Sequence, residues 1–242
     1  MMDLSPISSS LQQHHYCHVP DFRELIDIPP AAAESFRAHW EDLVRDEAFK
    51  DYTYRERRIL RYRLLPSRQL EMNTNPAFES PVTYAVNYRK GVNMLSYAQA
   101  SFIAHPVLQQ LVAADIAILE PYLGDHAYSI DIHQFRVIAQ GQSSSPTTSG
   151  IHQDGLDWVF MHFVDACNTT PVVSNIYLNE KAESRVLSVP MTRFLETLVV
   201  EDRIAYHQAG DVQQLSAEAP AWRDILVLGV RREHSDAERG AC

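Results

Sequence analysis

Cysteine is scarce in this chain of 242 residues, which has only three. Cys17, Cys167 and Cys242 lie far apart, and none belongs to a CxxC pair. An odd number of isolated cysteines argues against a disulfide framework and against a zinc site made of thiolates. The sequence therefore predicts neither of these features.

Long apolar runs are also missing. No stretch approaches the roughly 18 consecutive apolar residues that a transmembrane helix needs. The first twenty residues, MMDLSPISSSLQQHHYCHVP, lack the basic start and the apolar stretch of a secretory signal. We therefore expect a cytoplasmic protein with no membrane partner.

Basic residues are outnumbered, with 21 Lys and Arg against 31 Asp and Glu and a formal net charge of -10. An acidic protein repels phosphates, so we expect no nucleic-acid partner. The densest basic cluster alternates with apolar residues, which favours one face of a strand over a docking site. Its members are Arg55, Arg57, Arg58, Arg61 and Arg63.

What the chain does contain is typical of a globular protein. Hydrophobic residues make up 45% and charged residues 21%, and the length suits one medium domain. We expect a single domain over residues 1–242. Residues 1–20 are polar and rich in Ser, Gln and His, which predicts a loose arm at this end.

Two stretches of the first half have helical periodicity. Apolar residues at helical spacing predict one helix from Ala31 to about Phe49 and a second over 106–123. Pro106 can open the second helix, and Gly124 stands where a helix often ends. These two helices are expected to brace one side of a sheet.

Strand-like runs dominate the rest of the chain. Residues 52–65 read as an extended strand, whereas 67–103 is rich in loop signals. After residue 127, short strand-like runs follow one another at 128–139, 157–165, 172–178, 185–189, 197–200 and 225–231. A jelly roll or barrel is the natural closure for so many short strands. We expect an α+β, mainly β fold with its β core over about 127–232.

The sharpest local motif is Gly150-Ile-His-Gln-Asp-Gly155. On extended chain, His152 and Asp154 point to the same side and can bind one ion. His207 ends another extended run 55 positions later and would complete a triad of two His and one carboxylate. That triad leaves positions open for a chelating 2-oxo acid and for dioxygen, as iron(II) oxygenases need. Random order places on the order of one HxD in such a chain, so a mere His–Asp hydrogen bond is the alternative.

An arginine follows the last of these residues at a suitable place. Arg223 lies sixteen positions after His207, at the head of the final strand-like run. Its guanidinium fork can bind a carboxylate through two hydrogen bonds, which suits a dicarboxylate cosubstrate. The alternative is a surface ion pair with Asp224 or Glu218.

Five segments carry a family resemblance, and their order and spacing agree as well as their composition. They are His133-Gln-Phe-Arg136, Gly150-Ile-His-Gln-Asp-Gly-Leu-Asp-Trp-Val159, Ser174-Asn-Ile-Tyr177, Tyr206-His-Gln208 and Trp222-Arg-Asp224. In these segments the chain resembles the double-stranded β-helix 2-oxoglutarate oxygenases. More narrowly, it is similar to the bacterial family that includes L-isoleucine 4-hydroxylase and related free-amino-acid hydroxylases.

The resemblance implies a cupin-like, double-stranded β-helix with Fe(II), 2-oxoglutarate and O2 at one site. It implies that His152, Asp154 and His207 bind the iron, and that Arg223 holds the far carboxylate of 2-oxoglutarate. The expected reaction hydroxylates an unactivated carbon of a free L-amino acid or a close derivative, with succinate and CO2 as co-products.

Three further residues are candidates for the site. Gln134 and Arg136 share one face of a strand, and if that face looks inward they would reach the cosubstrate or a substrate carboxylate. Pairing with backbone carbonyls is the alternative. Asp157 is a candidate to contact a substrate amine, with a surface carboxylate at a turn as its alternative.

Other functions stay open at this stage. The same fold and cofactors could oxidise a biosynthetic intermediate in another way, such as desaturation. A metal-binding β-barrel without catalysis and a zinc hydrolase also fit two His and a carboxylate. Relatives carry a Gly-Gly pair where this chain has Pro171-Val-Val173, so the substrate need not be isoleucine. A homodimer through the N-terminal helices is a further expectation.

Overall fold

The computed structural model describes residues 3–47, 54–79, 92–139, 143–146 and 150–233. The α-helices in this part of the chain are α1 (Ser5–His14), α2 (Pro30–Arg37), α3 (Ala100–Ile103) and α4 (Pro106–Leu123). Short 3-10 helices are η1 (Phe22–Glu24), η2 (Ala38–Trp40) and η3 (Ala182–Ser184). Cys17 and Cys167 are free thiols, and Cys242 lies outside the described residues.

The strands fall in two groups along the chain. The first half contributes β1 (Tyr16–Val19), β2 (Val44–Arg45), β3 (Arg55–Leu64), β4 (Leu70–Met72), β5 (Ala77–Phe78) and β6 (Asn93–Met94). The second half contributes β7 (Tyr128–Ala139), β8 (Ser143–Ser144), β9 (Trp158–Cys167), β10 (Val173–Tyr177), β11 (Arg185–Pro190), β12 (Thr197–Glu201), β13 (Tyr206–Ala209), β14 (Val212–Gln213) and β15 (Ala221–Arg232).

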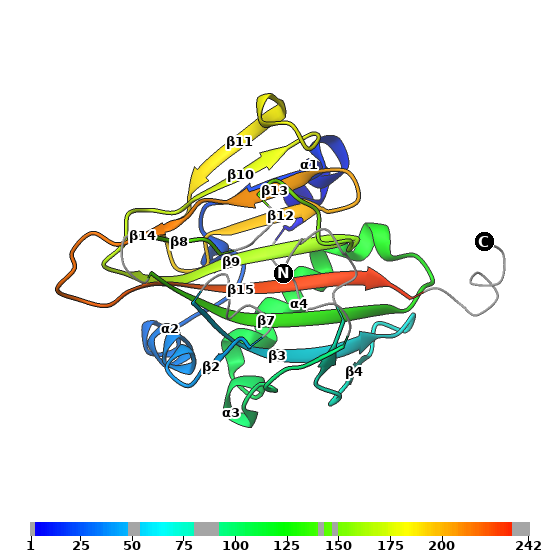
Figure 1. Ribbon diagram of the computed structural model, residues 1–242. Coiled ribbons are helices and arrows are strands. Elements are labelled where there is room, and N and C mark those ends of the chain that lie inside the picture. The colour runs from blue at the N-terminus through cyan, green and yellow to red at the C-terminus, as the bar shows by residue number, and fades with distance from the viewer. Residues whose placement is uncertain (1–2, 48–53, 80–91, 140–142, 147–149, 234–242) are drawn as a thin grey trace.

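A large antiparallel sheet forms the centre of the molecule (Figure 1). Its strands run in the order β1-β12-β9-β15-β7-β3-β2, and β4 pairs with β3. The long strands β7 and β15 pair over their whole length, from Ala221 opposite Ala139 to Arg232 opposite Tyr128. This uninterrupted register fixes which side chains of the two strands share a face.

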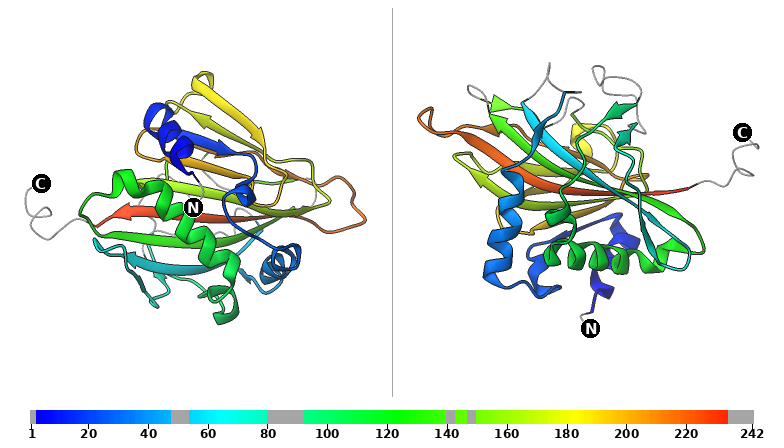
Figure 2. Two further views of the ribbon diagram at one scale, coloured as in Figure 1. Left: turned by 180° about the vertical axis from the view of Figure 1, so that it is seen from behind. Right: turned by 90° about the horizontal axis from the view of Figure 1, so that it is seen from below.

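Helix α4 covers one face of this sheet (Figure 2). The ring nitrogen Nδ1 of His105 accepts a hydrogen bond from Val107 N at 3.2 Å and so caps the helix, with Pro106 in its first turn. The chain leaves the helix at Gly124, where φ is +53°. The predicted helix over 106–123 is confirmed.

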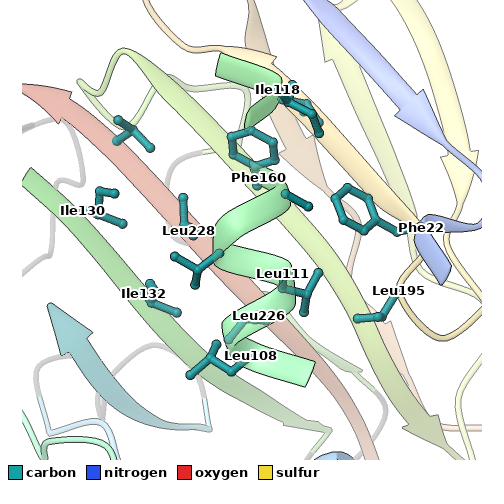
Figure 3. Packing of buried hydrophobic residues seen from close by; sticks show 14 of the residues in the cluster. Phe22, Leu108, Leu111, Ile118, Ile130, Ile132, Phe160, Leu195, Leu226 and Leu228 are labelled. Atoms are coloured by element: carbon teal, nitrogen blue, oxygen red, sulfur yellow. The ribbon is translucent and has the colours of Figure 1, made fainter. Parts of the chain in front are cut away.

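The apolar side of α4 packs on alternate residues of the central strands. Figure 3 shows Leu108, Leu111 and Ile118 of the helix against Ile132 of β7 and Leu228 of β15. All of these side chains are almost fully buried. This layer is the main hydrophobic core, and burying a side chain of this size stabilises the fold by about 1.5–3 kcal/mol.

A smaller sheet, β11-β10-β13, lies against the opposite face of the large one. An apolar cluster fills the space between the two sheets, with Phe163 from β9, Leu198 from β12, Ile176 from β10 and Val189 from β11. Two packed antiparallel sheets braced by helices on one side confirm the expected jelly-roll class. The central strands are consequently buried on both faces.

The expected loose arm over residues 1–20 is wrong. From Ser5 to His14 the chain forms α1, which contacts α4. Ile7 and Leu11 are four residues apart and both are buried in the main core. The hydroxyl of Ser8 donates to the carbonyl of Ile118 at 2.8 Å. Strand β1 then adds to the edge of the large sheet next to β12.

The first predicted helix is shorter than expected. It begins at Pro30, close to the expected start, but α2 ends at Arg37 and η2 continues only to Trp40. There the indole nitrogen of Trp40 donates to the carbonyl of Phe135 at 3.0 Å, so the chain turns onto β7. No helix in the described part of the chain is both long and apolar enough to span a membrane.

Candidate active site

Two histidines face each other across an antiparallel bridge. His152 N donates to His207 O at 3.0 Å, and His207 N donates to His152 O at 2.9 Å. Residues directly opposite in such a pair send their side chains to the same face. His207 also lies opposite Ile176, a member of the cluster between the sheets. Both imidazoles therefore point into the space between the sheets, with ring centroids 4.4 Å apart.

Asp154 completes the group. Its carboxylate oxygens lie 3.6 Å from His152 Nε2 and 3.4 Å from His207 Nε2. One ligand atom from each of the three residues fits within 4.8 Å of the others, a spacing that could hold a metal ion. The two histidines are buried, but 36% of the Asp154 side chain is exposed. The site is thus accessible from the Asp154 side.

The ring nitrogens of His152 have separate tasks. Nδ1 of His152 lies 2.8 Å from the carbonyl oxygen of Gly150, to which it can only donate. This contact leaves the lone pair of Nε2 directed to the side of Asp154, as a metal ligand requires. Gly150 has a φ of +63°, a conformation that glycine adopts without strain.

The three residues of the triad shift one another's pKa values. Partial burial would raise the pKa of the Asp154 carboxyl, but the contact with His207 and the charges of His152 and His133 hold that pKa below its usual range. Burial and the neighbouring His207 lower the pKa of His152. Burial would lower the pKa of His207, but the contact with Asp154 and the charge of Asp202 raise it. The shifts of Asp154 and His152 favour the carboxylate and the neutral imidazole that bind a divalent cation, whereas His207 must release its proton when it binds one.

Arg223 lies on the same inner face of the large sheet. It is opposite Val137 in the register of β7 and β15, and Val137 belongs to an inner apolar cluster. Its side chain is 2% exposed, and its guanidinium contacts soft groups among the described residues, with Met191 Sδ 4.0 Å from Nη2 and the Phe163 ring centroid 5.9 Å from Cζ. Nε has no hydrogen-bond partner among the described residues. Burial lowers the pKa of Arg223 to about 10.

Such a guanidinium is incomplete without an anion. Buried charges in proteins are paired, because an isolated one loses its hydration. The neighbouring Asp224 cannot serve on this face, because it points to the other side of β15 and binds Arg136. A ligand carboxylate would supply the missing partner.

Gln134 and Arg136 do not join this group, contrary to expectation. They share a face, as predicted, but it is the face of Ile130 and Ile132, under the helices. Arg136 forms two 2.8 Å hydrogen bonds to Asp224 and one to Glu41. The amide nitrogen of Gln134 donates to the carbonyl of His39 at 3.3 Å. Both side chains belong to the layer opposite the triad.

Asp157 is also engaged elsewhere. One carboxylate oxygen accepts a hydrogen bond from Arg232 N at 2.6 Å, and the other lies 2.5 Å from Arg203 Nε. With both oxygens used by the protein, Asp157 ties the start of β9 to its neighbours. The structure does not support a substrate amine as its partner.

A polar and aromatic wall that was not predicted lies on the inner face of β7. His133 is buried there between Phe78 and Phe135, with ring centroids 5.0 and 5.2 Å away. Burial and the charge of Arg57, with that of Arg55, hold the pKa of His133 well below its usual value. Asp154 acts on His133 in the opposite sense, which places this wall in the electrostatic field of the triad.

Both arginines of this wall come from β3. Arg57 lies opposite Phe135 in the pairing of β3 with β7, and Arg55 lies opposite Val137. Asp46 pairs with them at 3.0 and 2.6 Å respectively. Arg55 and Arg57 thus lie on one face of the strand, as predicted for the basic cluster. Only the alternation of β3 and β7 could have suggested that they share the triad's layer.

Comparisons with known proteins agree with this geometry. The model of the 2OG-Fe dioxygenase family matches residues 37–229. No curated protein matches the chain. Among solved structures, a bsmA homolog from Methylobium petroleophilum PM1 is similar with a TM-score of 0.81 and 23% identity, covering 95% of this chain and 93% of that one.

Two further structures share the fold. IDO from Bacillus thuringiensis is similar with a TM-score of 0.78 and 15% identity, over 96% of both chains. The Fe(II)/alpha-ketoglutarate-dependent dioxygenase TqaL has a TM-score of 0.73 and 16% identity, over 97% of this chain and 88% of that one. The family match covers most of the sequence and includes all three residues of the triad. The chain therefore belongs to the 2OG-Fe dioxygenase family, whose cofactors are iron and 2-oxoglutarate.

Proposed function

We propose that this protein hydroxylates an unactivated carbon of a free L-amino acid or a close derivative, with succinate and CO2 as co-products. His152, Asp154 and His207 are the proposed iron ligands, and Arg223 the proposed partner of the far carboxylate of 2-oxoglutarate. One observation carries the proposal: the triad and a buried arginine that forms no ion pair with any described residue lie on facing inner surfaces of one jelly roll.

The donor set fits iron. Two imidazole nitrogens and one carboxylate oxygen on one side of an ion leave its other positions open, the arrangement of non-haem iron oxygenases. When bound, iron and 2-oxoglutarate supply the oxidising power that breaks a C–H bond. The chain's own residues would bind the metal and the cosubstrate, orient the substrate and exclude water. A zinc hydrolase would have no use for Arg223, which is why we favour the oxygenase.

Arg223 explains the choice of cosubstrate. A forked guanidinium surrounded by Met191 and Phe163 selects a planar carboxylate, because two parallel N–H donors match its two oxygens. Its position on β15, away from the triad's bridge, suits the remote end of a dicarboxylate.

Two features support an amino acid as the substrate. The motif segments resemble those of free-amino-acid hydroxylases, and the wall formed by His133, Phe78 and Phe135 offers aromatic surface beside the ion pair of Arg57 with Asp46. Such a wall suits the apolar side chain of an amino acid.

The segment Pro171-Val-Val173 argues for a substrate other than isoleucine. Val172 is 3% exposed and packs with Val137, the residue opposite Arg223. A side chain therefore fills a part of the inner layer that the Gly-Gly pair of the resembling family would leave open. We therefore expect the space for the substrate beside the cosubstrate to differ in shape from that of the resembling family.

An amino-acid panel tests the proposal. The purified protein is incubated in air with Fe(II), 2-oxoglutarate and each free amino acid, and succinate and the product mass are measured. We expect at least one amino acid to stimulate succinate formation and to gain 16 mass units, the mass of one oxygen atom. A product that loses two hydrogens would indicate desaturation instead. No stimulation by any amino acid or simple N-acyl derivative would refute the substrate class.

A further inference from the structure

Asp202 lies in the turn between β12 and β13 and is 1% exposed. Its backbone is held in place, because Asp202 N donates to the carbonyl of Asp157 at 2.9 Å. A carboxylate this deep in the protein is retained only where it accepts hydrogen bonds. Its partners therefore indicate what the residue does.

Those partners belong to the HxD segment and to the distant His207. One oxygen of Asp202 accepts from Asp154 N at 3.0 Å, and the other accepts from Leu156 N at 2.9 Å. The first oxygen also lies 3.5 Å from His207 Nδ1, a buried nitrogen with no hydrogen-bond partner among the described residues. One side chain thus contacts the backbone of the HxD turn and the ring of the distant histidine.

We propose that Asp202 is a positioning residue that sets the spacing between the candidate metal ligands. The proposal rests on the ligand assignment made under the proposed function. The bridge of His152 and His207 fixes the two histidines, but Asp154 follows that bridge in an irregular turn. The two hydrogen bonds to Asp202 hold that turn, so they determine where the Asp154 carboxylate lies relative to the imidazoles.

The chemistry of the carboxylate matters for this task. It accepts two backbone hydrogen bonds on different oxygens and has lone pairs left for His207 Nδ1–H. An acceptor behind a metal-bound histidine fixes its tautomer and raises its basicity. Asparagine has the same shape but only one acceptor oxygen, so its NH2 group would face a backbone N–H. Asp202→Asn therefore removes one of the acceptor oxygens that these hydrogen bonds need, with little change in side-chain volume.

The test is the affinity of the metal-free protein for Mn(II), measured by calorimetric titration. Loss of an outer-shell partner commonly weakens metal binding by about 10–100-fold, and we expect this range for Asp202→Asn. Asp115→Asn is the matched control. Asp115 is equally buried and lies 3.0 Å from His162 Nε2, but under the helices. Its loss should lower the unfolding midpoint and leave the Mn(II) affinity unchanged.

The outcomes of this titration distinguish a positioning role from a purely structural one. Wild-type affinity in Asp202→Asn, or the same change as in Asp115→Asn, overturns the positioning role. If Asp202→Asn does not fold, Asp202→Glu decides, because it keeps the charge but displaces both oxygens. About tenfold weaker binding is then expected, and wild-type affinity overturns the proposal. His152→Ala in the same titration tests the ligand assignment itself: if it binds Mn(II) like the wild type, the triad assignment fails.

Discussion

At the scale of single residues, two buried arginines on neighbouring strands have different surroundings. Arg136 of β7 is neutralised by Asp224 and Glu41 under the helices. Arg223 of β15 faces the space between the sheets and meets a thioether and an aromatic ring. They are similar in chemistry and burial, so their variants separate the effect of the cosubstrate from that of the fold.

Arg223→Lys is expected to weaken binding of 2-oxoglutarate to the Mn(II)-loaded protein. Lysine keeps the charge but loses the fork, and a charge-assisted hydrogen bond contributes about 1.5–3 kcal/mol. We therefore expect an affinity at least tenfold lower by calorimetry. Arg136→Lys should lower the thermal midpoint and leave this affinity unchanged. Equal losses in the two variants would contradict the assignment of Arg223.

The same two residues show what strand alternation can predict. It correctly placed Gln134 and Arg136 on one face, because successive side chains in a strand point to opposite sides. It could not say which face is the active one, because β7 is buried on both. A polar residue in a strand covered on one side only would have been assigned without ambiguity.

At the scale of elements, helices were predictable where their ends are marked. Helix α4 has Pro106, a wide apolar stripe and Gly124, and its bounds follow from these signals. Helix α1 buries only Ile7 and Leu11 among serines and glutamines, a stripe too narrow to be recognised. Its stability comes from docking on α4 and from β1 at the sheet edge, which no local pattern contains.

Leu11→Ala tests whether the N-terminal segment is part of the core. Leu11 is 1% exposed, and removing a buried leucine side chain lowers the free energy of unfolding by about 2–5 kcal/mol. Gln13→Ala, on the exposed side of the same helix, should change it by less than about 0.5 kcal/mol. Urea unfolding compares the two. Indistinguishable midpoints would mean that the segment is the loose arm expected from its composition.

The triad was predictable only in combination. HxD alone is close to chance, but its position before a strand, the later His207 and the resemblance selected it. The bridge that joins His152 to His207 depends on strands far apart in sequence, so it was not foreseeable. Asp202 was missed because a single acidic residue in a turn carries no pattern. Its role is visible only from the hydrogen bonds it accepts.

At the scale of the whole molecule, the site joins the two sheets. His152 and His207 form the bridge beside the smaller sheet, whereas Arg223 and His133 belong to the larger one. Iron and 2-oxoglutarate together would therefore connect layers that are otherwise held by apolar packing. The single-domain organisation, the cytoplasmic location and the homodimer remain predictions.

Ligand binding across the sheets should stabilise the whole fold. A ligand at 100 times its Kd raises the free energy of unfolding by about 2.7 kcal/mol, provided it does not bind the unfolded chain. We expect Mn(II) with 2-oxoglutarate to raise the thermal midpoint of the wild type, and a chelator to reverse the effect. Asp154→Ala should show no such rise. A rise of the same size in that variant would place the metal elsewhere.

Release of CO2 from 2-oxoglutarate decides whether the triad holds a working iron. The protein is incubated in air with Fe(II), carboxyl-labelled 2-oxoglutarate and the amino-acid mixture, and labelled CO2 is counted for the wild type and for Asp154→Ala. We predict iron-dependent release by the wild type and a loss of at least about 100-fold in the variant, because the metal contributes several kcal/mol to such reactions. Equal release from both proteins would contradict the assignment of the triad.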